Sequence, residues 1–312
     1  MKIALTGITG MLGSHLVKQL TTEDPNGGEI EIRALIRENS IVDHLKPYED
    51  VDYIIGGLED KDSLRQLVED TEVVIHMAHF PGPVQTEDEL VEVNVNGSFH
   101  LLEEAKKARV KQFIFLSACS VFGELLPSVD ESHPLDETHP VRPSNLYGAI
   151  KSSIESLAFS YFKRRAFDVT ILRPVTMYGL RPQIDRSEWF QTIDYLATNY
   201  NVDLKGSTKY VSVDAVCQAV TKVMGNKDAA GKFYHLVDGH IHNLELGQMI
   251  VDTIDSFGEV EGIRGEQGVP MSNQAAKELG VEFKGKEGIK EYIKLVYDLQ
   301  TKYGGERAIE NW

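Results

Sequence analysis

The sequence has very few thiols, because Cys119 and Cys217 are its two cysteines among 312 residues. This scarcity excludes a disulfide framework and favours a reducing compartment. Long hydrophobic runs are missing as well: no stretch of about eighteen apolar residues occurs, and Met1 is followed by a short apolar segment instead of a basic leader. We therefore expect a cytoplasmic protein without a membrane segment.

Basic residues are scarce relative to acidic ones. The chain has 32 Lys and Arg against 48 Asp and Glu, for a formal net charge of −16. Nucleic-acid binding needs a basic surface, so no nucleic-acid partner is expected. We interpret the acidity as a solvated surface that keeps the protein soluble. His76 and His79 are three residues apart, but no third ligand accompanies them, and no metal site is predicted.

Short β-rich runs alternate with longer helical patterns through the first half of the chain. This alternation is typical of a parallel sheet covered by helices. The last of these strands should end at Arg173-Pro174, because proline cannot donate a hydrogen bond to a neighbouring strand. The predicted strands are 2–6, 30–36, 51–55, 72–76, 112–117 and 168–172, and the predicted helices are 11–21, 61–69, 86–109 and one from Ser144 or Asn145 to about Arg165.

Three glycines, Gly7, Gly10 and Gly13, stand between the first strand and the first helix. Such glycines permit a tight turn, a close approach of backbone to a pyrophosphate, and close packing of the helix on the sheet. Amides at the helix N-terminus then meet the phosphates. The pattern predicts an α/β fold with a Rossmann-type doubly wound parallel sheet that binds a dinucleotide, with further contacts from Thr9, Met11 and Leu12.

The second half is less regular and has expected loops at 179–187, 204–208, 225–231 and 262–272. The helical pattern at 213–224 should pack back on the first half. We predict a dinucleotide-binding domain over 1–173, with 209–224 packing on it, and a smaller, discontinuous substrate-binding lobe over 174–312.

Arg37 stands at the end of the second strand, where dinucleotide-binding proteins that prefer NAD usually carry an acid. A guanidinium suits a 2′-phosphate by its charge and its forked geometry. The alternative is a surface arginine paired with Glu38. We predict NADP as the cofactor, with NAD as the alternative.

Tyr147 and Lys151 are four residues apart on a predicted helix and therefore share one face. A free tyrosine has a pKa of about 10, which is too high for a base near neutrality. A nearby ammonium and a positively charged nicotinamide ring would both lower that pKa. We predict Tyr147 as the acid/base, with Lys151 also holding the nicotinamide ribose; the alternative is a surface pair of no function.

Together, the Gly-x-x-Gly-x-x-Gly turn and Tyr-x-x-x-Lys resemble the extended short-chain dehydrogenase/reductase family, also called the epimerase/dehydratase family. The segment 172–179, Leu-Arg-Pro-Val-Thr-Met-Tyr-Gly, resembles a further motif of that family. The resemblance implies additional cofactor contacts from Leu58, Met77, Ala78, His79, Ser117, Pro174 and Val175.

The family's catalytic Ser or Thr falls on Ala118 in this sequence, which is a departure from its pattern. Either Ser120 takes over the hydrogen bond to the reacting oxygen, or the site works with Tyr147 alone; we predict Ser120. Sugar-nucleotide 4,6-dehydratases carry an Asp-Glu pair where this chain has Cys119 and Ser120, which disfavours that reaction.

On the substrate side, Thr176 stands where relatives place an Asn, and the diphosphate-binding Arg of the family falls on Thr208, beside Lys209. We predict Thr176 and Lys209 as substrate contacts. Lys205, Lys209 or Arg181 could supply the missing positive charge, the alternative being that they are solvated surface cations.

Three functions are compatible with these residues. The first is an epimerase acting on a nucleotide sugar, the second an NADPH-dependent ketone or aldehyde reductase, and the third a dinucleotide-binding regulator that has lost catalysis, which Ala118 motivates. The resemblance also implies a homodimer in which helices 86–109 and 146–164 of each subunit form the interface.

Overall fold

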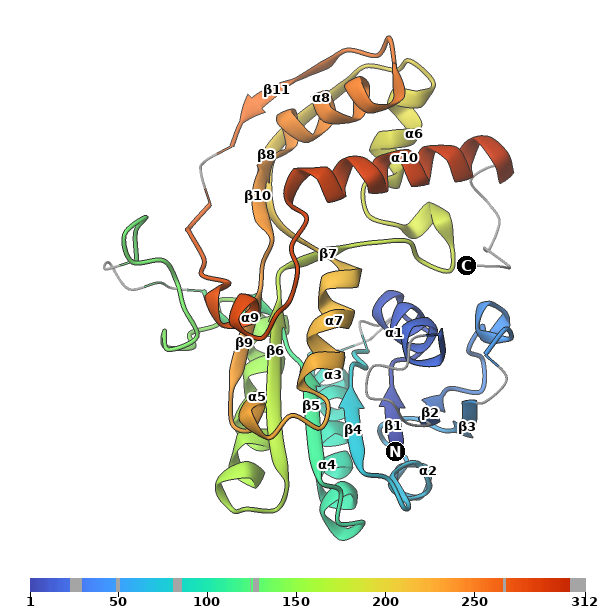
Figure 1. The fold of residues 1–312 in the computed structure, drawn as a ribbon, viewed down its shortest axis with the longest axis vertical. Helices are drawn as coiled ribbons and strands as arrows, with labels where there is room; N and C mark the ends of the chain where they lie inside the picture. Colours follow the sequence, from blue (N-terminus) through green and yellow to red (C-terminus); the bar gives the residue numbers. More distant parts are fainter. Residues whose placement is uncertain are drawn as a thin grey trace.

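The computed structural model describes residues 1–22, 30–48, 51–80, 86–123, 125, 129–265 and 268–303. A seven-stranded parallel sheet of order β3-β2-β1-β4-β5-β6-β9 forms the lower half of the molecule in Figure 1. This confirms the Rossmann-type fold. Its strands are β1 (Lys2–Thr6), β2 (Glu31–Ile36), β3 (Val51–Ile55), β4 (Val73–His76), β5 (Gln112–Leu116), β6 (Asp168–Pro174) and β9 (Phe233–Leu236).

Helices cover both faces of this sheet. On one face, α1 (Met11–Thr22) and α7 (Val213–Val223) share a core cluster with β1 that includes Leu16 and Val216. On the other face, α2 (Lys61–Val68), α4 (Gly97–Lys107) and α5 (Leu146–Lys163) bury Leu64, Leu101 and Ile154 against β5. The sheet is therefore buried on both sides, as its nearly continuous apolar strands require.

The predicted helix 86–109 is divided in three. It consists of α3 (Glu87–Val91), a π-helical turn at Glu92–Asn96, and α4. The wide turn carries Asn94 inward, where its amide bonds the backbone of both Phe80 and Leu90. One extra residue in the helix thus fixes the segment that follows β4.

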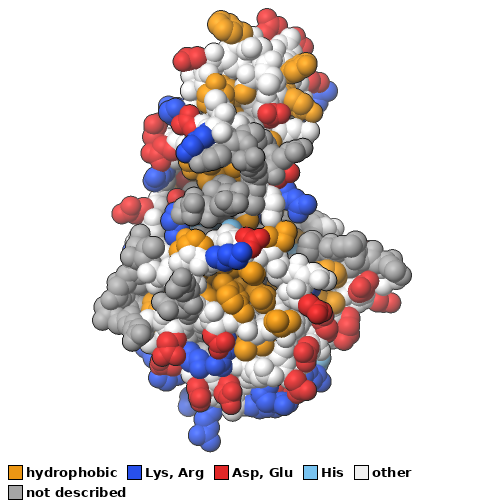
Figure 2. All heavy atoms as spheres, turned by 90° about the vertical axis from the view of Figure 1, so that its right-hand side faces the viewer, with side chains coloured by type: hydrophobic (Ala, Val, Ile, Leu, Met, Phe, Trp, Pro, Cys, Tyr) orange, Lys and Arg blue, Asp and Glu red, His pale blue; other side chains and the backbone are white. Residues whose placement is uncertain are grey.

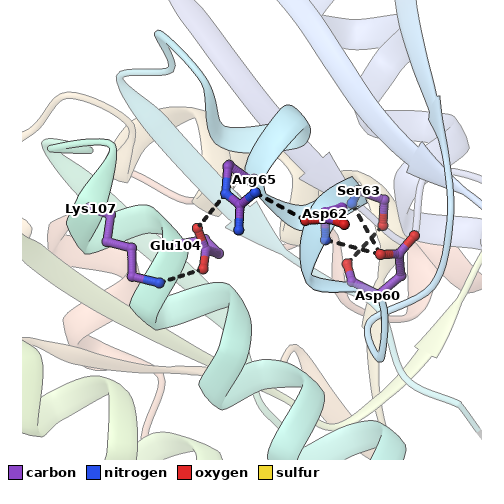
Figure 3. A network of polar contacts seen from close by, with 6 residues as sticks. All are labelled: Asp60, Asp62, Ser63, Arg65, Glu104 and Lys107. Atoms are coloured by element: carbon purple, nitrogen blue, oxygen red, sulfur yellow. Dashed lines mark hydrogen bonds and ion pairs between the residues drawn. The ribbon is translucent and has the colours of Figure 1, made fainter.

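Glu104 of α4 is a buried carboxylate that joins two of the covering helices (Figure 3). Arg65 of α2 reaches it at 3.5 Å, and Lys107 reaches it at 2.7 Å from the next turn of α4. Asp60 caps the start of α2 by accepting from the amides of Asp62 and Ser63. These polar contacts hold α2 and α4 together behind the strands that end at the site.

Three sequence predictions about strands are wrong. The expected loop 262–272 begins inside β11 (Val260–Arg264). β6 continues to Pro174, because β5 has already ended at Leu116 and the missing N–H of Pro174 costs no bond on that side. The expected loop 204–208 lies inside β8 (Val202–Ser212), which is paired along its whole length with β11 (Val260–Arg264), β10 (Gly239–His242) and β7 (Thr176–Tyr178). The polar residues of β8 resemble a turn in sequence, but neighbouring strands satisfy its backbone.

The upper lobe in Figure 1 is built on β8. Its core includes Ile193, Leu246 and Ile293, one from each of the helices α6 (Phe190–Ala197), α8 (Asn243–Ile254) and α10 (Gly285–Tyr303). The chain passes from this lobe back to the first sheet through α7 and β9, and the division at 173/174 stays a prediction. The remaining elements are α9 (Gln274–Glu278) and 3-10 turns at Asp43–Leu45, Cys119–Val121, Ile184–Arg186 and Lys227–Ala229.

None of the helices in the described part of the chain is long and apolar enough to span a membrane. On the face drawn in Figure 2, acidic and basic side chains are interspersed over the lower half. The negative net charge is thus distributed over the surface on this side.

Candidate active site

Within the described residues, two cavities stand out at the carboxyl ends of the parallel strands. The first, here called the glycine-turn cavity, has a volume of about 310 Å³ and includes backbone from the ends of β1 to β4. Its position agrees with the rule that ligands of open α/β sheets bind at the carboxyl ends of strands. It is lined by Thr6, Gly7, Thr9, Gly10, Leu35, Ile36, Arg37, Ser40, Gly56, Gly57, Leu58, Ala78, His79 and Phe80.

A side chain would meet different surroundings at each of the three glycines of the turn. Gly7 adopts φ +81°, and a Cβ there would lie 2.8 Å from the amide nitrogen of Ala78. A Cβ on Gly13 would lie 2.3 Å from the carbonyl oxygen of Gly7, so this glycine lets α1 pack on the turn itself. A Cβ on Gly10 would meet only that same carbonyl, at 3.4 Å, which leaves its remaining surroundings open.

A directed chain of hydrogen bonds fixes the floor of this cavity. The Ala78 amide donates to Thr6 Oγ1, so the Thr6 hydroxyl donates to His76 Nδ1, at 2.7 Å. His76 Nε2–H then donates to Ser98 Oγ at 2.8 Å, and Ser98 donates to the Asn94 carbonyl. Burial and Lys151 lower the pKa of His76 to about 3, so its ring is neutral, as this chain requires.

Arg37 reaches the cavity lining and is stacked there. Its guanidinium carbon lies 4.3 Å from the centre of the Phe80 ring, and its amide donates to Ser40 Oγ. The alternative of an ion pair with Glu38 finds no support, because the described parts of the chain contain no ion pair of Arg37. A stacked, unpaired guanidinium beside a hydroxyl is suited to an anionic group.

The second cavity, here called the Tyr147 cavity, has a volume of about 670 Å³ and lies between the two halves of the molecule. Predicted residues Ser120, Tyr147, Thr176 and Lys209 all line it. The other lining residues are Met11, Ala118, Cys119, Phe122, Gly123, Leu125, Leu135, Pro174, Val175, Met177, Arg181, Glu188, Ser207, Thr208, Val269 and Met271.

Tyr147 stands where the two cavities meet. Its ring packs edge-on against His79 of the glycine-turn cavity, with 4.8 Å between the ring centres. The neighbouring Gly148 permits a close approach of α5 to the Ser120 turn, since a Cβ there would lie 2.1 Å from the Ser120 carbonyl oxygen. Ser120 and Tyr147 therefore both belong to the lining of the Tyr147 cavity.

Lys151 is buried one turn further along α5. Its Nζ donates to the Leu116 carbonyl at 2.8 Å and lies 5.9 Å from the centre of the Tyr147 ring. Burial lowers the pKa of Lys151 to about 8 and raises the pKa of Tyr147. The expected lowering of the phenol's pKa is therefore absent from the chain alone, because desolvation opposes the phenolate. His79, beside the pair, has its pKa lowered to about 4 by burial and by Lys151.

The turn after β5 brings three small side chains to the phenol. The Ser120 Oγ is buried without a hydrogen-bond partner within the described chain, although polar atoms of this kind are rarely left unpaired. Cys119 donates its thiol proton to the Arg173 carbonyl, and burial raises its pKa. Ala118 contributes no polar atom. Ser120 is therefore the one residue of this turn with a side-chain hydroxyl in the cavity lining, and its catalytic role stays a prediction.

A buried ion pair supports α5 from below. Arg173 of β6 donates from Nε and Nη2 to both carboxylate oxygens of Glu155, at 2.9 and 2.7 Å. Both side chains are at most 5% exposed, and Phe122 and Phe233 flank the guanidinium. Glu155 is one turn beyond Lys151, so this pair fixes α5 to the sheet.

The candidate cations on the substrate side differ in their surroundings. Lys205 is exposed and pairs with Asp203 at 3.0 Å, outside either cavity. Arg181 and Lys209 both line the Tyr147 cavity. Thr176 lies beside Thr208, with 3.4 Å between the hydroxyl oxygens.

Several predicted cofactor residues do not line the glycine-turn cavity. Met11, Pro174 and Val175 line the Tyr147 cavity, and Leu12, Gly13, Met77, Ser117 and Lys151 line neither. Sequence reasoning missed Phe80 and Ser40 beside Arg37, and it missed Leu135 and Met271. The described residues hold no group of three His, Cys, Asp or Glu side chains arranged for a metal.

The model of the NAD dependent epimerase/dehydratase family matches residues 3–237. A dTDP-D-glucose 4,6-dehydratase from Dictyostelium discoideum is 27% identical over 80% of this chain, and the match spans 62% of that protein's length. A 4-hydroxy-2-methyl-3-oxo-4-farnesyl-3,4-dihydroquinoline-1-oxide ketoreductase from Stigmatella aurantiaca is 28% identical over 90% of this chain and 80% of its own.

Solved structures share the fold at low sequence identity. A dTDP-glucose 4,6-dehydratase from Streptomyces venezuelae, solved with NAD bound, has a TM-score of 0.80 at 21% identity and covers 97% of this chain and 99% of its own. A UDP-glucose 4-epimerase from Thermotoga maritima has a TM-score of 0.80 at 23% identity, covering 97% and 100%.

Proposed function

Because the chain belongs to the NAD dependent epimerase/dehydratase family, we propose that it is a nicotinamide-dinucleotide oxidoreductase acting on a secondary alcohol or ketone. The observation that carries the proposal is the position of Tyr147 at the junction of the two cavities. A phenol there can exchange a proton with a substrate oxygen while the dinucleotide occupies the neighbouring space.

The glycine-turn cavity fits a dinucleotide. Gly7 and Gly10 would hold the pyrophosphate at the start of α1, where backbone amides and the helix dipole favour anions. Leu58 and His79 would border the two ends of the cofactor. The nicotinamide, when bound, supplies or accepts the hydride.

The chain's own groups handle the proton. Tyr147 would give or take the proton of the substrate hydroxyl, and Ser120 would donate a hydrogen bond to the same oxygen. Lys151 uses one of its three N–H donors on Leu116 and would bond the nicotinamide ribose with the others. Its positive charge beside the cavity would favour the phenolate once that ribose is in place.

Two substrate classes fit this chemistry. The dTDP-D-glucose 4,6-dehydratase and UDP-glucose 4-epimerase that this chain resembles favour a nucleotide sugar, on which hydride removal and return to the opposite face would invert a carbon. Carbonyl reduction with NADPH is the second candidate, favoured by Arg37 and by the ketoreductase relative. Activity of either kind would exclude the regulator that Ala118 suggests.

We predict that Arg37→Asp reverses cofactor preference from NADPH to NADH. Loss of the guanidinium removes the charge-assisted bonds to a 2′-phosphate, and the new acid suits a ribose hydroxyl. NADPH affinity should fall by about tenfold or more, measured as Kd by fluorescence titration of both cofactors. Glu38 lies outside the cavity lining, so Glu38→Gln should change the Kd of neither NADPH nor NADH. An unaltered NADPH:NADH ratio in Arg37→Asp would remove the NADP assignment.

We also propose a homodimer formed by α3, α4 and α5. Val91 and Phe99 are 38% and 39% exposed on the first two of these helices, which is a typical apolar contribution to an interface. The mass in solution should be twice that of one chain. A monomer at working concentration contradicts this proposal.

The two free cysteines, Cys119 and Cys217, support a cytoplasmic location.

A further inference from the structure

We propose that the Tyr147 cavity takes an oxo acid, or the corresponding hydroxy acid, whose single carboxylate binds Lys209 and whose apolar body lies along Phe122, Leu135 and Met271. The inference rests on the proposed function and selects carbonyl reduction over chemistry on a nucleotide diphosphate. It follows from the distribution of charge and apolar surface in one cavity.

The cavity lining offers one uncompensated positive charge. Three charged side chains line it, namely Arg181, Glu188 and Lys209. Arg181 and Glu188 carry opposite charges that attract each other, so the pair adds no net charge to the lining, although burial raises the pKa of Glu188. Lys209 is half-buried, and within the described residues no carboxylate forms an ion pair with it. A partly desolvated ammonium gains most from one anionic partner, whereas a second negative charge would be buried without a counterion.

Among the described residues, the immediate neighbours of Lys209 add no further charge. A Cβ on Gly268 would lie 2.8 Å from Lys209 Nζ, so the ammonium lies against this backbone. The Gly268 amide donates to Nε2 of His240, which therefore accepts there and is neutral. Burial and Lys209 lower the pKa of His240, in agreement with this tautomer. The ammonium is thus the anion-binding group at this end of the cavity.

Lys209 lies in the same cavity as Tyr147 and Ser120, the residues proposed to contact the reacting oxygen. Its charge interacts with the Cys119 thiol, the residue next to Ser120. Lys209, Ser120 and Tyr147 all line the same cavity, so an anion at Lys209 and a reacting oxygen at Tyr147 would belong to one small substrate. A substrate with its carboxylate a few bonds from its carbonyl can bind Lys209 with the first group and reach Tyr147 with the second.

The other end of the cavity is apolar. Leu135 forms a β-bridge with Met271, and its amide donates to the Pro270 carbonyl at 2.9 Å. The segment 268–271 therefore runs from Lys209 to Leu135 and makes one wall with a charged end and an apolar end. Phe122 completes the apolar end. An apolar substrate body suits the apolar part of this wall.

The test compares matched substrates. Oxidation of NADPH is followed with 3-oxohexanoate and, separately, with its methyl ester. UDP-glucose and dTDP-glucose are each incubated with NADP⁺ or NAD⁺, and their conversion is measured by product analysis. We expect kcat/KM for the acid to exceed that for the ester by about tenfold or more. Lys209→Met should raise KM for the acid by a similar factor without affecting the ester or kcat, and Lys209→Arg should keep the preference.

Lys205→Met is the matched control, because Lys205 lies on the same strand, is exposed and pairs with Asp203. It should leave all rates unchanged. Equal rates for acid and ester, an equal effect of Lys209→Met on both, or faster conversion of either nucleotide sugar would overturn the inference while leaving the oxidoreductase proposal intact. Absence of turnover with every compound would overturn both.

Discussion

Replacing Tyr147 with phenylalanine is expected to lower kcat by about 10²- to 10⁴-fold while cofactor affinity stays unchanged. The ring that packs on His79 remains in the variant, and only the hydroxyl that would exchange the substrate proton is lost. The measurement is steady-state oxidation of NADPH with a carbonyl substrate, together with a titration of cofactor binding.

Tyr200→Phe provides the control for this experiment. Tyr200 is 65% exposed, in the upper lobe, and lines neither cavity, so loss of its hydroxyl should change no rate. If Tyr147→Phe retained the turnover of the unaltered chain, the enzymatic proposal would be wrong and the regulator would become the better hypothesis. A loss of cofactor binding would instead assign Tyr147 a structural part in the glycine-turn cavity.

Breaking the buried pair beneath α5 is the second change with a large expected effect. Arg173→Met leaves the Glu155 carboxylate buried without its bidentate partner, which should lower the free energy of unfolding by about 3–5 kcal/mol. The double variant Glu155→Leu with Arg173→Met removes both charges and should recover most of that loss. Urea unfolding at neutral pH measures all three proteins.

The exposed pair of Lys227 with Asp168 is the comparison. Asp168 begins the same strand, β6, but Lys227 is 78% exposed, so Lys227→Met should cost less than about 1 kcal/mol. Equal destabilisation by Arg173→Met and Lys227→Met would contradict the argument from burial. The argument would also be contradicted if the double variant Glu155→Leu with Arg173→Met were as unstable as Arg173→Met alone.

The sequence predicts those parts of the site that depend on neighbours along the chain. Gly7 to Gly13 follow a buried strand directly and open a helix, so their place at the sheet edge follows from local order. Tyr147 and Lys151 share a helical face by spacing alone. The family resemblance, which the comparisons confirm, rests on the same local motifs.

Features made by segments distant in sequence could not be predicted in this way. Arg37 meets Phe80 because the turns after β2 and β4 converge, and no local pattern records that meeting. Leu135 pairs with Met271 for the same reason. β8 escaped prediction because its polar residues resemble a loop until β10 and β11 flank it. Glu155 and Arg173 become a pair only when α5 lies on β6.

The junction between β8 and α7 contains no spare residue. Ser212 ends the strand and also caps the helix, accepting from the Ala215 amide, and Val213 already belongs to α7. That helix packs on α1, which begins at the glycine turn. Because no loop separates β8 from α7, the strand that carries Lys209 is joined directly to the helix that packs on α1, and a rotation of the upper lobe would act on both.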